Sequence, residues 1–326
     1  MGAVTGLSVR VLRKILGSNS KTHSLKYNGY VDLSDQEAND YILDLLSHDW
    51  ESGLMISKFG TVELSTIVAA HYELNRWSIE YIKDVFNYDA SIDLRRTLKI
   101  LCSNAGFFPY DVDLGIKFYK RMLEDMPEID VLGSYIYQEK YVEQFLKSVR
   151  MRVNLESFYA PFLWKNPWTK SLKNKRVLVI HPFIESIRHQ YENNREKIWN
   201  NPDVLPEFKD LLTLKAVQSI ADAKDLPFNN WFEALKYMEN EISKLNFDVA
   251  IIGCGAYGMC LAAHVKRMGK VAIHLAGWTQ MLFGVYGNRW ITDQPEFSSF
   301  INKYWIRPSE NERPLGASKV ENGCYW

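Results

Sequence analysis

The fold is decided by the stretch Phe247-Asp-Val-Ala-Ile-Ile-Gly-Cys-Gly-Ala-Tyr-Gly258. Its apolar first half predicts a short buried strand, and the glycines that follow mark a tight turn. Residues 257–268 then have the apolar spacing of a helix, and Lys270-Val-Ala-Ile-His-Leu275 predicts a second strand. Because the connection is long enough to join parallel strands, this segment is a βαβ unit. We therefore expect an α/β fold in which helices flank a parallel sheet.

Two further runs predict strands of the same sheet. Lys175-Arg-Val-Leu-Val-Ile-His181 is apolar and β-branched, and Gly53-Leu-Met-Ile-Ser-Lys-Phe-Gly60 is short, apolar and ended by glycine. The second run is expected in the sheet because a lone buried strand would leave its backbone groups unpaired. Helical patterns cover most of residues 33–126 and the segments 184–199, 208–220 and 232–245.

These elements favour one composite domain over two. It spans residues 31–326, with a mostly helical part at about residues 31–150 and a parallel-sheet part at about 175–300. Residues 1–30 form a separate segment whose first half is amphipathic, with Leu7 and Leu12 on one face and Arg10 and Arg13 on the other. This segment either packs on the domain or frays, or it makes a peripheral contact with an anionic membrane surface.

The amino-acid composition argues against several classes of protein. The 326 residues carry 39 basic and 39 acidic side chains, and this balance argues against a dedicated nucleic-acid binder. Hydrophobic residues make up 47%, which excludes wholesale disorder. The 4 cysteines form no CxxC pair, and no apolar run reaches the roughly 18 residues that span a bilayer. We expect a cytoplasmic protein, or one peripheral at the inner face of the cell membrane.

Several predicted strands end in polar or glycine-bearing turns, and open parallel sheets bind ligands at the carboxyl ends of their strands. The glycine turn matches G-x-G-x-x-G at Gly253, Gly255 and Gly258, with Ala256 and Tyr257 between the last two. Such a turn before a helix favours a phosphate group. A dinucleotide site also needs an acidic residue after the next strand, and none occurs before Asp293. The alternative is that the glycines only allow close packing.

Other polar residues follow the strands. His181 and His274 could donate hydrogen bonds to a diphosphate or a sugar, or be structural. Ser186 and Gln190 are spaced to share a helix face beside His181. Glu63 follows a glycine turn and is a candidate base or metal ligand. Candidate ligand contacts are Asn104, in a polar loop that contains glycine and aromatic residues, and Gly277 and Gln280, which follow the strand that ends near residue 275.

The order and spacing of these segments resemble bacterial GT-D-type glycosyltransferases of capsule and O-antigen loci. The resemblance is carried by Lys58-Phe-Gly-Thr-Val-Glu63, Asn104-Ala-Gly-Phe-Phe-Pro109, Val177-Leu-Val-Ile-His-Pro-Phe183 with Gln190-Tyr-Glu-Asn193, Gly255-Ala-Tyr-Gly258, Ala272-Ile-His-Leu-Ala-Gly277, Gln280-Met-Leu-Phe-Gly284 and Gly323-Cys-Tyr-Trp326. It implies a Rossmann-like fold and an enzyme that uses a nucleotide-sugar donor, often UDP-linked, to extend a saccharide or lipid-linked saccharide. It also implies donor contacts from Phe59, Gly60 and Thr61.

The family's Asp-x-Glu motif binds Mg²⁺ or Mn²⁺, and here it is matched by Thr61-Val-Glu63. Glu63 is kept and the aspartate is replaced by threonine, so the metal would need other oxygen ligands. Two alternatives remain. The chain could be a non-catalytic nucleotide-sugar or polysaccharide-binding accessory protein, which the Thr61 departure favours, or a nicotinamide-dependent oxidoreductase, which the missing acidic residue disfavours.

Overall fold

A computed structural model describes residues 31–326 of the chain except 76–77, 79–92, 221–225, 315 and 321–322. The amphipathic segment at residues 1–30 therefore lies outside the described residues. Within the described part, no helix combines the length and apolar character needed to cross a membrane.

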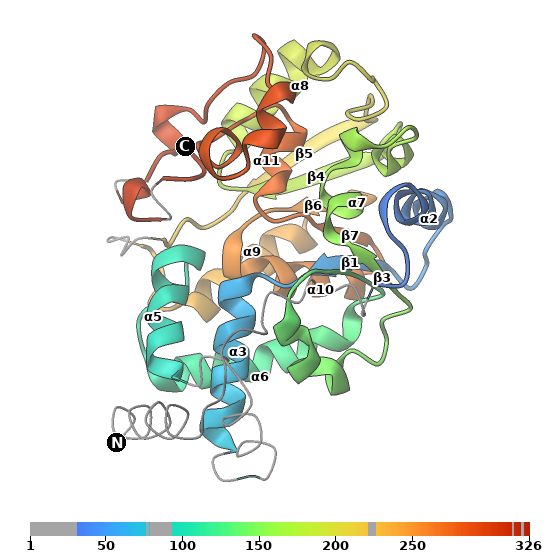
Figure 1. Cartoon of the computed structure of the whole chain (residues 1–326). Helices are drawn as coiled ribbons and strands as arrows, with labels where there is room; N and C mark the ends of the chain where they lie inside the picture. The colour runs from blue at the N-terminus through green and yellow to red at the C-terminus, as the bar shows by residue number, and fades with distance from the viewer. Residues whose placement is uncertain (1–30, 76–77, 79–92, 221–225, 315, 321–322) are drawn as a thin grey trace, which may run out of the picture.

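Seven parallel strands form one sheet, in the order β3-β2-β1-β7-β6-β4-β5 (Figure 1). The strands are β1 (Leu54–Lys58), β2 (Val131–Ser134), β3 (Met151–Asn154), β4 (Arg176–His181), β5 (Asp210–Lys215), β6 (Val249–Ile252) and β7 (Val271–His274). The predicted parallel sheet is confirmed, and so are the strands expected at β1, β4, β6 and β7. In particular, β1 lies inside the sheet between β2 and β7, with Ile56 opposite Ile273.

The helices cover both faces of this sheet (Figure 1). They are α2 (Asp35–Ser47), α3 (Thr61–Leu74), α5 (Leu94–Ala105), α6 (Val112–Asp125), α7 (Leu155–Tyr159), α8 (Ile184–Ile198), α9 (Trp231–Ser243), α10 (Gly258–Arg267) and α11 (Trp278–Leu282). The predicted helices at α8, α9 and α10 are confirmed within about two residues.

The predicted helix at residues 208–220 is wrong. Residues Asp210–Lys215 instead form β5, which pairs with β4 alone at the edge of the sheet. An edge strand is only half buried, and its sequence can therefore include polar residues. In β5 the leucines at 211, 212 and 214 are interrupted by a threonine and flanked by charged residues, so they do not form the continuous apolar run of a central strand. Leucine is also a strong helix former, and the spacing was therefore mistaken for a helical pattern.

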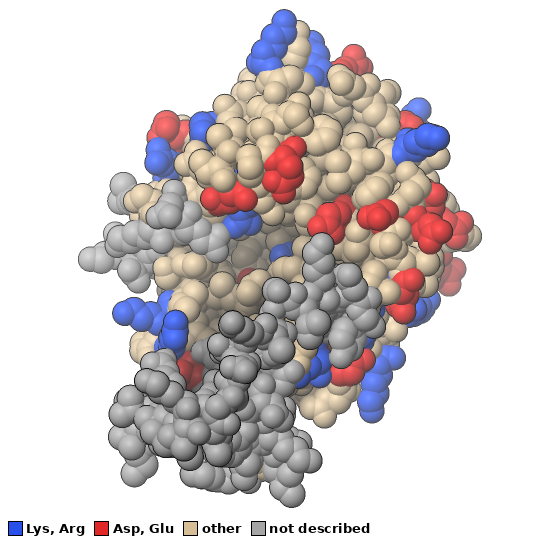
Figure 2. All heavy atoms as spheres, in the orientation of Figure 1, with Lys and Arg blue, Asp and Glu red and all other residues tan. Residues whose placement is uncertain are grey.

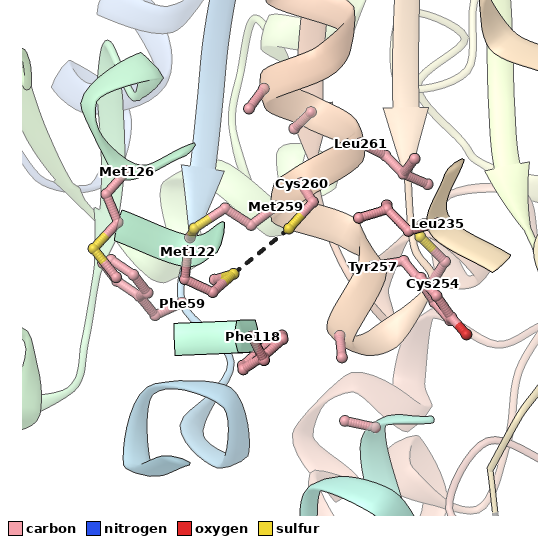
Figure 3. Packing of buried hydrophobic residues seen from close by; sticks show 14 of the residues in the cluster. Phe59, Phe118, Met122, Met126, Leu235, Cys254, Tyr257, Met259, Cys260 and Leu261 are labelled. Carbon is pink, nitrogen blue, oxygen red and sulfur yellow. Dashed lines mark hydrogen bonds between the residues drawn. The ribbon is translucent and has the colours of Figure 1, made fainter. Parts of the chain in front are cut away.

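Side chains alternate between two cores because successive residues of a strand point to opposite faces. Leu178 and Ile180 of β4 belong to one cluster, together with apolar residues of α3, α5, α6, α9 and α10. Val177 and Val179 belong to the other, together with residues of α2, α7, α8 and α11. Figure 3 shows part of the first cluster, where Cys260 of α10 lies 3.6 Å from the Met122 sulfur of α6.

The order of the strands creates a crevice at their carboxyl ends. The segments after β1 and β6 lead into α3 and α10 on one face, whereas those after β4 and β7 lead into α8 and α11 on the other. Since these strands alternate as β1, β7, β6, β4 across the middle of the sheet, neighbouring connections leave in opposite directions. Such divergence opens a crevice in which α/β proteins bind ligands.

Candidate functional site

A cavity of about 220 Å³ opens at the carboxyl ends of β1, β4, β6 and β7. In the view of Figure 2 the surface is hollowed, and Lys or Arg atoms lie inside the hollow. The strand ends that were expected to converge therefore line one cavity. The residues predicted for the site that line it are Gly60, Thr61, Glu63, Asn104, His181, Gly253, Gly255, Tyr257, His274, Gly277 and Gln280.

Five predicted site residues do not line the cavity. Phe59 is fully buried in the core, and Ala256 and Gly258 are buried within the glycine segment itself. Ser186 and Gln190 are both buried on α8, but neither lines the cavity. The Ser186 hydroxyl donates to the Glu312 carboxylate, and the Gln190 amide donates to the carbonyls of Gly284 and Tyr304, each at 2.9 Å.

The glycine turn is shaped by protein contacts. Gly255 has a φ of +56°, and a Cβ there would lie 2.5 Å from the Ala105 carbonyl oxygen. A Cβ on Gly258 would lie 2.2 Å from Nε2 of His274. Close packing alone therefore explains why both positions are glycine, without any bound phosphate. The turn also begins the helical segment that leads into α10, and the first N–H groups of a helix have no acceptor within it. An anion in the cavity could accept from them.

His181 is a neutral hydrogen-bonding group in the wall of the cavity. Its Nδ1 accepts a hydrogen bond from the Phe183 amide at 3.0 Å, so the neutral ring carries its proton on Nε2. Burial lowers the pKa of His181 to about 3, which keeps the ring uncharged at neutral pH.

His274 is also held neutral. Burial, together with the nearby charge of Lys58, lowers its pKa to about 3. Its Nδ1 lies 3.1 Å from the Ser57 hydroxyl, while Nε2 is buried and has no hydrogen-bond partner.

Other buried polar atoms around the cavity also lack a partner. They belong to the lining residues Gln218 (Nε2), Gln280 (Oε1) and Trp326 (Nε1). Buried polar atoms are nearly always paired in native proteins, so a group of unpaired ones around a cavity indicates a polar ligand or water. Two of these atoms, the Gln218 amide and the Trp326 indole, are donors.

Glu63 is the carboxylate that lines the cavity. It is the third residue of α3, and its carboxylate folds back over Gly60, where a Cβ would lie only 1.9 Å from Oε2. A carboxylate is favoured at this end of a helix because the helix dipole is positive there. Thr61 is engaged nearby, with its hydroxyl 3.2 Å from the Tyr135 hydroxyl, which donates to the Phe59 carbonyl at 2.9 Å.

This donor set does not fit Mg²⁺ or Mn²⁺ held by the protein. Such ions are bound through carboxylates and other oxygen ligands, and Glu63 is the one carboxylate side chain among the described residues that line the cavity. In the described part of the chain, no group of three His, Cys, Asp or Glu residues could hold a metal ion.

No protein-family model, curated protein or solved structure matches the chain. The architecture that the sequence predicts, a parallel α/β sheet flanked by helices, is thus shown by the coordinates alone.

The sequence analysis did not assign several residues that line the cavity. They are Lys58, Tyr135, Gln218, Ser219, Arg289, Tyr325 and Trp326. Lys58 ends β1, and its position at a strand end was a usable signal. The aromatic residues come from distant segments, and their positions in the sequence gave no such signal.

Lowering the pH is expected to destabilise the fold through the two buried histidines. Each has a pKa of about 3 in the folded protein and about 6.5 when unfolded, so between these values the unfolded chain binds protons that the folded chain does not. The free energy of unfolding should fall as the pH drops below about 6.5, by up to about 1.4 kcal/mol per pH unit for each histidine.

Urea unfolding between about pH 7 and pH 5 measures this loss. The variant His181→Asn keeps an acceptor for the Phe183 amide and should show a shallower pH dependence than the wild type. The exposed His48, replaced in the same way, is the control for loss of an imidazole. Equal slopes for wild type and His181→Asn would contradict the assignment of His181 as a neutral buried ring.

Proposed function

We propose that the chain transfers a sugar from a nucleoside diphosphate sugar, UDP-linked, to a saccharide or lipid-linked saccharide in bacterial surface polysaccharide synthesis. The observation that carries this proposal is the cavity at the strand ends, where one carboxylate, two neutral histidines, unpaired donors and two cations meet. A transferase of this kind needs donors and positive charge for a diphosphate, and a base for the acceptor.

The proposed reaction is a displacement at the anomeric carbon of the donor. The acceptor oxygen forms a bond to that carbon, and the bond from the carbon to the diphosphate oxygen breaks with its electron pair. Glu63 takes the proton of the acceptor hydroxyl, and the nucleoside diphosphate leaves. His181 Nε2 and the N–H groups of the turn at Gly255 donate hydrogen bonds to the diphosphate oxygens.

An oxidoreductase that binds a nicotinamide dinucleotide is less well supported. Its ribose is usually held by an acidic residue at the end of the strand that follows the glycine turn. Here that strand is β7, which ends at His274, and the imidazole lies directly against Gly258. The ring occupies this position, and the segment to Gly277 contains no carboxylate.

A non-catalytic nucleotide-sugar-binding protein is the second candidate. It is favoured by one observation, the replacement of the metal-binding aspartate by Thr61, whose hydroxyl is already engaged with Tyr135. Such a protein would keep the cavity and the diphosphate contacts, and it would show no turnover.

A thermal-shift screen with UDP, GDP, dTDP, CMP and NAD, each with and without Mn²⁺, tests the ligand class. We expect one nucleoside diphosphate at about 100 times its Kd to raise the free energy of unfolding by about 2.7 kcal/mol. Release of that nucleoside diphosphate from its sugar derivatives, measured with saccharide acceptors, then separates the enzyme from the binding protein. Stabilisation by NAD alone would overturn the transferase proposal.

A further inference from the structure

We propose that Lys58 and Arg289 bind the diphosphate of the ligand directly and take the place of a divalent cation. The inference deepens the proposed function and rests on it for the identity of the ligand, a diphosphate ester. It concerns two side chains to which the sequence analysis gave no role.

The charges around the cavity favour an anion. Among the described residues that line the cavity, Lys58, Arg289 and Glu63 carry a formal charge at neutral pH, and the two histidines are neutral. Two of these three charges are positive. The Glu63 carboxylate also lies against Gly60 at the start of α3, where the helix dipole offsets part of its charge.

Lys58 has no ionic partner among the described residues. It is the last residue of β1 and is only partly exposed, and its Nζ lies 5.4 Å from the centroid of the Tyr135 ring. An ammonium group that is partly buried without a counter-ion is costly, and a bound anion removes that cost. A phosphate bound at the end of β1 would therefore serve as the counter-ion of Lys58.

Arg289 approaches the cavity from the segment that follows α11. Its guanidinium stacks on the Tyr325 ring, with the central carbon 4.5 Å from the ring centroid, and one Nη lies 3.4 Å from Cys324 Sγ. The backbone N–H of Arg289 also donates to the Cys324 carbonyl at 2.7 Å. Stacking fixes the plane of the guanidinium, and a fixed planar fork is the arrangement that binds phosphate oxygens in pairs.

A second observation points to the same kind of ligand. The Trp326 indole N–H and the Gln218 amide are buried donors that find no partner among the described residues, and both residues line the cavity with Arg289. An indole nitrogen can only donate, so its missing partner is an acceptor. Phosphate oxygens are strong acceptors and would satisfy these donors.

The cations also supply positive charge that the described residues do not provide through a metal ion. Those residues contain no group of three His, Cys, Asp or Glu that could hold a metal. A diphosphate nevertheless needs positive charge to bind and to leave. Lys58, at the end of β1, supplies that charge from the protein.

Calorimetric titration of the full chain in EDTA, with UDP and with inorganic pyrophosphate as probes, tests the inference. We expect both probes to bind without metal, and Lys58→Met and Arg289→Gln each to weaken binding by about 10-fold or more. Arg289→Lys should restore part of the affinity because it keeps the charge. Melting temperatures of all variants confirm that they are folded.

The matched controls are Lys303→Met and Arg307→Gln. Lys303 lies 5.1 Å from the Tyr304 ring and Arg307 5.0 Å from the Tyr286 ring, so both repeat the cation–aromatic contact on exposed surface outside the cavity. Both controls should bind the probes as the wild type does. A titration with farnesyl diphosphate distinguishes a lipid-linked diphosphate from a nucleotide as the natural source of the group.

Each outcome of these titrations either supports or overturns the inference that Lys58 and Arg289 bind the diphosphate. Binding of UDP and pyrophosphate only when Mn²⁺ is present, no binding at all, or equal binding by wild type, Lys58→Met and Arg289→Gln would overturn the inference. Metal-free binding that both substitutions weaken supports it, even if no nucleotide sugar is turned over. In that last case the transferase proposal fails while the diphosphate site stands.

Discussion

Replacing Glu63 by glutamine is expected to lower sugar transfer by about 10²- to 10⁴-fold, the usual range for loss of a general base. Glutamine keeps the size of the side chain and its contact with Gly60, but it cannot accept a proton from the acceptor hydroxyl. Binding of the nucleoside diphosphate should be unchanged or slightly tighter, because the substitution removes a negative charge from the cavity. Initial rates and calorimetric affinities measure the two effects separately.

Glu37→Gln is the matched control for this substitution. Glu37 is the third residue of α2, just as Glu63 is the third residue of α3, and it is exposed away from the cavity. Both substitutions remove a carboxylate from the first turn of a helix, so their effects on stability should be similar, at roughly 0.3–1 kcal/mol. Full activity of Glu63→Gln would show that another group takes the proton.

Gly255→Ala is expected to cost about 3 kcal/mol of unfolding free energy. Gly255 has a positive φ, which an alanine adopts only with strain, and its new Cβ would lie 2.5 Å from the Ala105 carbonyl oxygen. That oxygen ends α5 and cannot move without shifting the helix. The turn should therefore be displaced, and nucleoside diphosphate binding should weaken together with stability. Urea denaturation and ligand titration measure both losses.

Gly323→Ala separates backbone strain from the steric clash. Gly323 also has a positive φ, of +75°, but the nearest atoms of other described residues to a new Cβ lie 3.8 Å and 3.9 Å away. This variant should lose about 1 kcal/mol, the cost of an unfavourable φ alone. If Gly255→Ala lost no more stability than Gly323→Ala, the close contact with α5 would not constrain the turn.

The fold was predictable where strands are central and buried on both faces. The segments at β4, β6 and β7 are continuous apolar runs bounded by turn residues, and each was predicted within about two residues. The strands β2 (Val-Leu-Gly-Ser) and β3 (Met-Arg-Val-Asn) were not predicted, because polar residues and a glycine interrupt the apolar runs that mark β6 and β7. The edge strand β5 was assigned to a helix, since its half-buried leucines fit either pattern.

The site was predictable only from the ends of strands. Sheet topology brings Glu63, His181 and His274 to one cavity, and that inference needed no contact between particular side chains. Ser186 and Gln190 do not line the cavity, because helical spacing shows that two residues share a face but not which way that face points. Trp326 was not assigned because it approaches the cavity from a distant part of the sequence.

The position of β1 in the sheet has a consequence for how the chain folds. One edge of β1 pairs with β2, but the other pairs with β7, so Leu54–Lys58 keeps an unpaired edge until Val271–His274 has been synthesised. An unpaired apolar strand edge can pair with another chain. Contacts between such distant segments also slow folding, because a long loop must close first. Until β7 has been synthesised, the nascent chain therefore presents an unpaired apolar strand edge at β1.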